Sequence, residues 1–345
     1  MKTSTKPKVL MLCVSYGKFG GTELGAERLR NWLVDNGIDI TVIANGSSKD
    51  IINVPVFIMP KIIWTVMAYF ISTWYVLLHD VDVIYSRYAT YPLFVGAVMK
   101  FITRKPLVVS IHGGDIRHNG VVKFLINIFL RAADVVVCYD NQEHIDELNR
   151  RGIKPHVIPN GVDTRRFKPK KIKSDINKII FVGGIREIKG FFDMVTLTSD
   201  DRFDGRKDVE FDIYSDPTIR GDSRTKFLGR IPNEVMPEIM EGGQLFILPS
   251  HAEGVPGALL EAMASGMYVI ASDLDFTRKA VEKKFLFPPK DVNSMADLVL
   301  KFCDDKKDYF GDQNKKNREF VVNNYSIDKS GEMWKELFVG LIKRK

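Results

Sequence analysis

Two glutamates flank a glycine-containing turn in the second half of the chain. Glu253 follows the apolar run 245–248, and Glu261 lies eight positions later within the run 258–264, which is rich in strong helix formers. This order predicts a buried strand, a turn and a helix. The backbone N–H groups at a helix start attract phosphate, and carboxylates accept hydrogen bonds from paired hydroxyls. The spacing therefore predicts a site for a sugar joined to a nucleotide through phosphate.

At this segment the sequence resembles the retaining nucleotide-sugar glycosyltransferases of family 4, which have the two-domain GT-B fold. The family's paired-glutamate motif is matched by Glu253-Gly254-x-Pro256 and by Leu260-Glu261-Ala262-Met263-Ala264. The resemblance implies that Glu253 contacts hydroxyls of the transferred sugar and that Glu261 holds the ribose. It also implies that backbone groups of the turn and helix start contact the phosphates, at Gly254, Gly257, Ala258, Leu259 and Leu260.

Two positions in the first half fall where the family has contacts to the donor. His112 directly follows the apolar run 107–111, and the family has a histidine here that orients the transferred sugar. Taken alone, a histidine at this place is more often a turn or core residue. Gly20 and Gly21 follow the first apolar run, where the family has a glycine loop near the donor phosphates, although such a pair is more often plain turn chemistry.

The segment 182–190 contains the other cationic candidates. The family has an arginine directly after the first glycine and a lysine five positions later; Lys189 matches the lysine, whereas Gly184 occupies the arginine's position. Arg186 either substitutes from two residues further on or is a surface residue. By resemblance, the catalytic set is His112, Glu253, Lys189 and Arg186, with Lys189 stabilising charge on the departing diphosphate.

The length of 345 residues favours two domains, because single cores rarely grow so large. Short apolar runs alternate with helix-compatible stretches on both sides of the lysine-rich segment 168–175, which predicts parallel α/β sheets. We expect a Rossmann-like acceptor-side domain (1–168), a Rossmann-like nucleotide-sugar-binding domain (169–326) and a helix (327–345) that crosses back to the first domain. In the GT-B architecture the two sheets face a central cleft.

The membrane question depends on the segment 62–78, which contains no charged residue and nearly reaches spanning length. Its polar residues and centrally placed aromatic residues favour a buried or interfacial helix. Lys123 and Arg131 flank the apolar run 124–130, and the chain ends in a basic tail. These features predict peripheral contact with an anionic membrane; the alternative is core-facing helices and a solvated end.

Charge and cysteine content narrow the partners and the location. The formal net charge of +7 is compatible with nucleic acid, a membrane or an acidic substrate, but no recognised nucleic-acid module accompanies it, and we expect no nucleic-acid partner. Three widely spaced cysteines argue against disulfides and zinc. We therefore expect a cytoplasmic protein, with or without peripheral contact to the inner face of the membrane.

The chemistry that the resemblance implies is transfer of a sugar, with retention at the anomeric carbon, from a UDP-sugar or GDP-sugar to a glycan or lipid-linked acceptor. The expected setting is synthesis of cell-surface polysaccharide, glycolipid or glycoprotein glycan. No aspartate-rich metal motif is evident, so we expect no metal and no cofactor besides the donor substrate. Two rival hypotheses stay open: a nucleotide-sugar epimerase or phosphorylase of the same fold, and a non-catalytic sugar-nucleotide binding protein.

Overall fold

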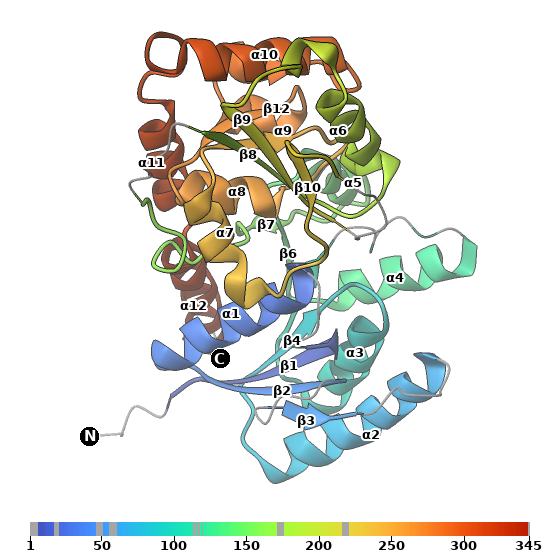
Figure 1. The fold of residues 1–345 in the computed structure, drawn as a ribbon. Helices are drawn as coiled ribbons and strands as arrows, with labels where there is room; N and C mark the ends of the chain where they lie inside the picture. Colours follow the sequence, from blue (N-terminus) through green and yellow to red (C-terminus); the bar gives the residue numbers. More distant parts are fainter. Residues whose placement is uncertain are drawn as a thin grey trace. The chain divides into compact units, whose positions relative to one another are not determined.

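The computed structural model describes residues 6–16, 21–45, 51–54, 61–112, 115, 118, 120–170, 176–215 and 221–343. The chain forms two compact units, one comprising Met1–Gly161 with Ile327–Lys345 and the other Val162–Ser326 (Figure 1). Each unit contains one parallel sheet between layers of helices. The alternation of apolar runs with helix-compatible stretches predicted this arrangement, and the prediction is confirmed.

The sheet of the first unit has seven strands in the order β3-β2-β1-β4-β5-β6-β7. The strands are β1 (Lys8–Ser15), β2 (Asp39–Asn45), β3 (Ile51–Asn53), β4 (Val83–Arg87), β5 (Leu107–Ile111), β6 (Val135–Cys138) and β7 (His156–Val157). All neighbouring pairs are parallel. The central strands β4, β5 and β6 are buried along their whole length, which is typical of a parallel sheet covered on both faces.

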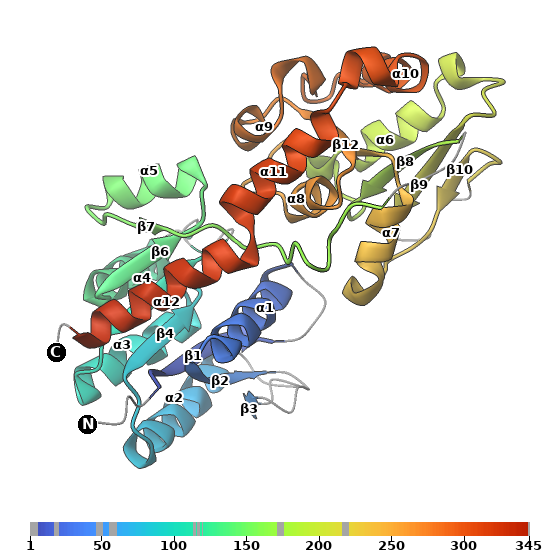
Figure 2. The same ribbon diagram turned by 90° about the vertical axis from the view of Figure 1, so that its left-hand side faces the viewer.

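Two groups of helices cover the two faces of this sheet (Figures 1 and 2). One core cluster joins the sheet to α2 (Lys61–Leu78), α3 (Tyr91–Thr103), α4 (Gly120–Ala132) and α5 (Gln142–Arg150). The other joins it to α1 (Gly21–Asp35) and α12 (Ile327–Lys343). Within the described ranges, no helix is both long enough and apolar enough to cross a membrane.

The C-terminal helix α12 returns to the first unit and packs against α1, as the sequence predicted. The approach is close, since a Cβ added at Gly331 would lie 2.3 Å from the ring of Trp32. The Trp32 indole N–H donates to Asp328 Oδ1 over 2.7 Å. Trp334 is buried on the same side, with its ring centroid 4.8 Å from that of Tyr85. The apolar face of α12 therefore belongs to the core of the first unit.

The sheet of the second unit has six strands in the order β10-β9-β8-β11-β12-β13. They are β8 (Asn177–Val182), β9 (Val209–Tyr214), β10 (Thr225–Phe227), β11 (Leu245–Leu248), β12 (Tyr268–Ser272) and β13 (Leu286–Phe287). Helix α6 (Phe191–Thr198) packs against α10 (Val292–Asp304), and α8 (Gly257–Ala264) packs against α7 (Met236–Gly242) and α11 (Gln313–Tyr325). The short helix α9 (Asp275–Ala280) follows β12.

The direction of strand addition reverses once in each sheet. From β8 the chain moves to β9 on one side, whereas β11, the other neighbour of β8, leads to β12 and β13. The same reversal lies between β1 and β4 in the first sheet. Because open parallel sheets bind ligands beyond the carboxyl ends of the strands at such a point, the loops that follow these four strands are the expected ligand sites.

Candidate functional site

Lys189 and Glu253 form an ion pair at the reversal point of the second sheet. Lys189 lies in the 3₁₀ turn Glu187–Lys189 that follows β8, and Glu253 lies in the loop that follows β11. Lys189 Nζ is 2.5 Å from Glu253 Oε1, and Ser250 Oγ donates to the same oxygen over 2.9 Å. The structure thus brings together two side chains that are 64 positions apart and that the sequence predicted separately.

Contacts between the two loops hold this pair in place. The His251 backbone N–H donates to the Ile188 carbonyl over 2.9 Å. Gly190 has a φ of +67°, and a Cβ there would lie only 2.0 Å from the Pro249 carbonyl oxygen, so no other residue fits without a shift. His251 Nε2 also lies 2.6 Å from Asp193 Oδ2 in the first turn of α6. Sequence reasoning missed His251 and Asp193, because no local spacing links residues 58 positions apart.

Helix α8 starts beside this pair, at Gly257. The residue before it, Pro256, makes no side-chain cap, so the first N–H groups of the helix are available to an anion. Gly257 is exposed, and a Cβ there would meet nothing within 4 Å. Leu259 and Leu260 are buried and anchor the helix start in the core, which leaves their backbone as the group that a ligand can meet.

The other residues predicted to bind the sugar-nucleotide donor lie in the same segment, between β11 and the middle of α8. Gly254 and Ala258 are half-buried in the turn and in the first turn of α8. Glu261 is 8% exposed, which does not fit the interpretation of a freely solvated helix glutamate.

Arg186 lies in the loop after β8 and is exposed. A Cβ added at Gly184 would lie 3.8 Å from Arg186 Nε, so the Arg186 side chain extends back over Gly184. Its guanidinium group therefore begins close to the space that a side chain at position 184 would enter.

In the first unit, His112 follows β5 directly and is 3% exposed. Its backbone N–H donates to Asp115 Oδ2 over 3.0 Å, and the Ala89 N–H donates to the same oxygen over 3.1 Å. Asp115 thereby ties the loop after β4 to the loop after β5. Gly21 is the first residue of α1, whereas Gly20 lies outside the described residues.

Buried hydrogen bonds connect the His112 ring to Arg87. Arg87 Nη1 donates to Tyr85 Oη over 3.4 Å, Tyr85 Oη is 3.0 Å from Ser110 Oγ, and Ser110 Oγ is 2.7 Å from His112 Nε2. A guanidinium group only donates, whereas the two hydroxyl groups and the Nε2 atom of His112 can each donate or accept in this chain of contacts. Burial and the charge of Arg87 lower the pKa of His112, so the ring is neutral.

The Asp115 carboxyl gives a pH-dependent prediction. Burial raises the pKa of Asp115 to about 6 although two N–H groups donate to it. The stability that comes from its protonated form is therefore complete below about pH 4 and is lost as the pH rises through about 6. Asp115→Asn should flatten this dependence and increase the free energy of unfolding at pH 8 by about 1 to 2 kcal/mol. Urea unfolding between pH 4 and 8 tests this; an unchanged pH dependence in the variant would contradict it.

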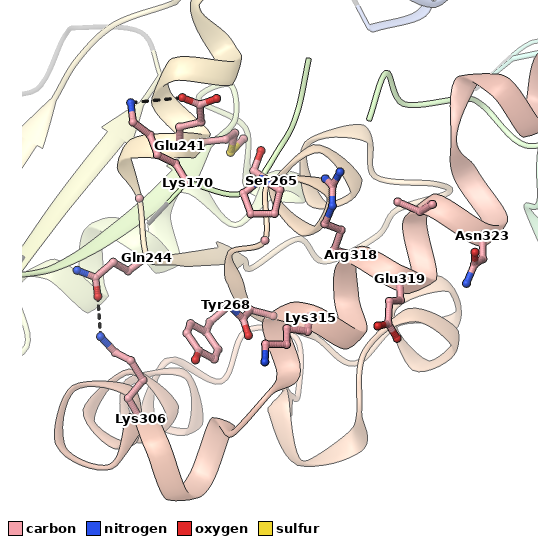
Figure 3. Close-up of a pocket in the computed structure, with 16 residues that line it drawn as sticks. Lys170, Glu241, Gln244, Ser265, Tyr268, Lys306, Lys315, Arg318, Glu319 and Asn323 are labelled. Carbon is pink, nitrogen blue, oxygen red and sulfur yellow. Dashed lines mark hydrogen bonds and ion pairs between the residues drawn. The ribbon is translucent and has the colours of Figure 1, made fainter. Parts of the chain in front are cut away.

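A cavity of about 940 Å³ lies at the opposite end of the second sheet, where its central strands begin (Figure 3). Gln244 and Tyr268, which line it, stand at the amino ends of β11 and β12, whereas Glu253 follows the carboxyl end of β11. Lys306 Nζ donates to Gln244 Oε1 over 2.6 Å within it. None of the residues predicted to bind the sugar-nucleotide donor lines this cavity. The cavity is therefore separate from the predicted donor site.

Two parallel Rossmann-like sheets, with a C-terminal helix that returns to the first unit, define a GT-B protein. The fold is similar to that of sucrose-phosphate synthase from Thermosynechococcus elongatus, with a TM-score of 0.81, 16% identity and coverage of 99% of this chain and 100% of that one. It is also similar to HepE of Anabaena, solved in complex with UDP-glucose, with a TM-score of 0.75, 18% identity and coverage of 96% and 99%.

The chain belongs to glycosyltransferase family 4. The model of this family, Glycosyltransferase Family 4, matches residues 19–166, and the model described as Glycosyl transferases group 1 matches residues 176–305. The family membership that the paired glutamates predicted is therefore confirmed.

The sequence is similar to those of two bacterial glycosyltransferases. It is 27% identical over 259 residues to the UDP-Gal:alpha-D-GlcNAc-diphosphoundecaprenol alpha-1,3-galactosyltransferase of Escherichia coli, covering 65% of each chain. It is 25% identical over 241 residues to the putative teichuronic acid biosynthesis glycosyltransferase TuaC of Bacillus subtilis, covering 64% of this chain and 61% of that one. The chain thus spans slightly less than two thirds of the length of either relative.

Proposed function

We propose that the protein is a retaining glycosyltransferase of the hexosyltransferase type, which transfers a sugar from a nucleoside diphosphate sugar to an acceptor hydroxyl. The observation that carries this proposal is the Lys189–Glu253 ion pair, held at the sheet's reversal point beside the N-terminus of α8. An ammonium group, a carboxylate and unpaired helix N–H groups suit diphosphate and sugar hydroxyls together. Membership of the family supports the same reaction class.

In this reaction the bond between the anomeric carbon and the diphosphate oxygen breaks, and a bond from that carbon to the acceptor oxygen forms. The acceptor proton passes to the departing diphosphate. The N–H groups at the start of α8 bind the diphosphate, and Lys189 stabilises its growing charge. Because an ammonium group has three donors, Lys189 can bind a phosphate oxygen while it keeps its contact with Glu253.

The remaining residues hold the donor's other parts. Glu253 accepts hydrogen bonds from sugar hydroxyls, with its carboxylate oriented by Ser250. Glu261 binds the ribose hydroxyls. In the first unit, neutral His112 orients the transferred sugar, and the glycines at 20 and 21 contribute backbone contacts to the donor. The donor is a UDP-sugar or a GDP-sugar; UDP is the first choice, because the E. coli relative is named for UDP-Gal and HepE is bound to UDP-glucose.

The names of the relatives support a glycan or lipid-linked acceptor. The E. coli relative is named for a diphosphoundecaprenol-linked acceptor, and the B. subtilis relative for teichuronic acid biosynthesis. We place the present protein in the synthesis of cell-surface polysaccharide, glycolipid or glycoprotein glycan. A lipid-linked acceptor also implies work at the inner face of the membrane, with peripheral contact to anionic lipid.

The test is release of nucleoside diphosphate from a panel of UDP-, GDP- and ADP-sugars, comparing the natural sequence with Glu261→Ala. We expect release from one donor, suppressed by the substitution, with product formed only when an acceptor hydroxyl is supplied. Conversion of the donor without an acceptor indicates an epimerase, and a requirement for inorganic phosphate indicates a phosphorylase. A thermal shift with nucleotide but no release from any donor indicates a binding protein and contradicts the proposal.

A prediction about Arg186 follows from its position over Gly184. Arg186→Ala should raise the KM for the donor about ten-fold or more, because a charge-assisted hydrogen bond contributes about 1.5 to 3 kcal/mol. Adding Gly184→Arg to this variant should restore much of the loss. Arg165→Ala, which removes another exposed arginine of the second unit, is the matched control. Steady-state kinetics with the preferred donor measure the KM of each variant. An unchanged KM in Arg186→Ala would show that Arg186 is a surface residue that does not contact the donor.

A further inference from the structure

The outward surface of three neighbouring helices in the first unit is apolar. Helices α2, α3 and α4 lie side by side over one face of the sheet (Figures 1 and 2). They hold 13 of the 20 exposed large apolar side chains of the described residues. We call this set the docking face: Val66, Phe70, Trp74, Leu77, Leu78, Val98, Phe101, Ile102, Val121, Val122, Phe124, Leu125 and Ile128.

These side chains do not contribute to the core beneath them. Phe101 is 86% exposed and Trp74 is 69% exposed, whereas α4 buries only Ile126 and Leu130 against the unit. Soluble monomers rarely expose contiguous apolar patches of this kind, and larger ones mark interaction sites. A set of exposed apolar side chains of this size indicates an interaction surface.

The charges on the three helices favour an anionic partner. Not one of α2, α3 and α4 contains an aspartate or a glutamate, while Lys100, Lys123 and Arg131 lie on them. Two carboxylates from neighbouring segments reach these lysines: Asp134 is 2.7 Å from Lys100 Nζ, and Glu147 is 4.0 Å from Lys123 Nζ. Arg131 donates to a backbone carbonyl and so keeps its full charge. The docking face is thus an apolar surface with cationic residues and no acidic residue of its own.

We propose that the docking face inserts into the head-group region of an anionic lipid bilayer. Its aromatic and aliphatic side chains enter the boundary between head groups and acyl chains, and the lysine and arginine side chains meet the anionic head groups. In this arrangement the three helices lie along the membrane surface. The docking face would bring the enzyme to a lipid-linked acceptor in the membrane. This consequence rests on the proposed function, whereas the docking itself does not.

A protein partner fits the docking face less well. Protein interfaces contain about one hydrogen bond per 100 to 200 Å² of buried area, and they place polar groups around an apolar centre. Among the described side chains of the three helices, the exposed residues outside the docking face are only Gly120, Lys123, Arg131 and Ala132. A bilayer needs no matching hydrogen bonds from such a surface, whereas a protein partner does.

Vesicle flotation tests the proposal with the full chain. Phosphatidylcholine vesicles with and without phosphatidylglycerol serve as the probe. We expect the natural sequence to float with the anionic vesicles and to bind less at high salt. The triple variant Phe70→Ser/Trp74→Ser/Phe101→Ser should lower the partition coefficient at least about ten-fold. The matched control is Phe192→Ser, which removes an aromatic side chain that is 54% exposed in the second unit and should leave binding unchanged.

Two results would overturn the proposal: no binding of the natural sequence to either vesicle, or an equal loss of binding with Phe192→Ser. In the first case, a dimer of the natural sequence that the triple variant dissociates would assign the docking face to self-association. Thermal melts show whether the triple variant is folded. Donor cleavage measured without vesicles separates this test from that of the proposed function. The triple variant should retain that cleavage, so failure of docking leaves the transferase proposal intact, and vesicle binding without any cleavage leaves docking intact.

Discussion

Replacement of Lys189 by alanine should lower kcat for donor cleavage by about 10²- to 10³-fold. Lys189 Nζ lies in the turn that follows β8, 2.5 Å from Glu253 Oε1. Charge on the departing diphosphate grows in the transition state, so loss of this cation should act on kcat more than on the donor KM. Steady-state release of nucleoside diphosphate measures both constants.

Three companion variants make this result specific. Lys189→Arg keeps a cation and should recover part of the rate. Glu253→Gln keeps the shape of the side chain but removes the partner charge, so we expect a smaller loss of kcat and a weaker discrimination between sugars. The matched control is Lys170→Ala, because Lys170 is also paired with a glutamate, 3.5 Å from Glu241, but lines the cavity at the opposite end of the sheet. Equal losses in Lys170→Ala and Lys189→Ala would contradict the assigned role.

Gly190→Ala should destabilise the second unit by about 2 to 5 kcal/mol and lower donor cleavage nearly as much as Lys189→Ala. Gly190 has a left-handed backbone, which costs alanine about 1 to 2 kcal/mol. In addition, its Cβ would lie 2.0 Å from the Pro249 carbonyl oxygen, and relief of such overpacking costs about 1 to 3 kcal/mol. The loop that carries Lys189 must then move away from the loop that carries Glu253.

Gly205→Ala is the control for this prediction. Gly205 has a φ of +76°, close to that of Gly190, but a Cβ there would meet nothing within 4 Å. It should therefore show the cost of the backbone conformation alone, about 1 to 2 kcal/mol, without loss of cleavage. Urea unfolding and donor cleavage of the two variants separate backbone strain from loop displacement. Similar effects of both substitutions would show that the contact with Pro249 does not position Lys189.

The sequence predicted the strands that carry the site. The run 245–248 is apolar throughout and the run 107–111 is apolar except for Ser110, because a strand in the middle of a parallel sheet is buried on both faces. The edge strands β3, β7, β10 and β13 were not predicted. They are two or three residues long, and β7 is exposed at both positions, so they leave no apolar run in the sequence.

The sequence predicted some residues of the candidate site and missed others. The residues that it missed share one property. Lys189 and Glu253 stood out because each belongs to a local motif beside glycine. The His251–Asp193 pair and the Ser110–Tyr85–Arg87 hydrogen bonds arise only when neighbouring strands bring distant segments together. The sequence also did not predict the extent of the docking face, because an apolar helix residue looks the same whether it faces the core or the surface.

Hydrogen–deuterium exchange, measured with and without UDP or with the nucleotide of whichever donor is cleaved, tests the central claim most directly. That claim places the donor at the loops after β8 and β11. We predict slower exchange in peptides that cover 183–190 and 250–261, with the effect lost in Lys189→Ala. Slower exchange confined to peptides 240–244 and 306–323, which border the cavity at the opposite end of the sheet, would contradict the assignment of the donor site.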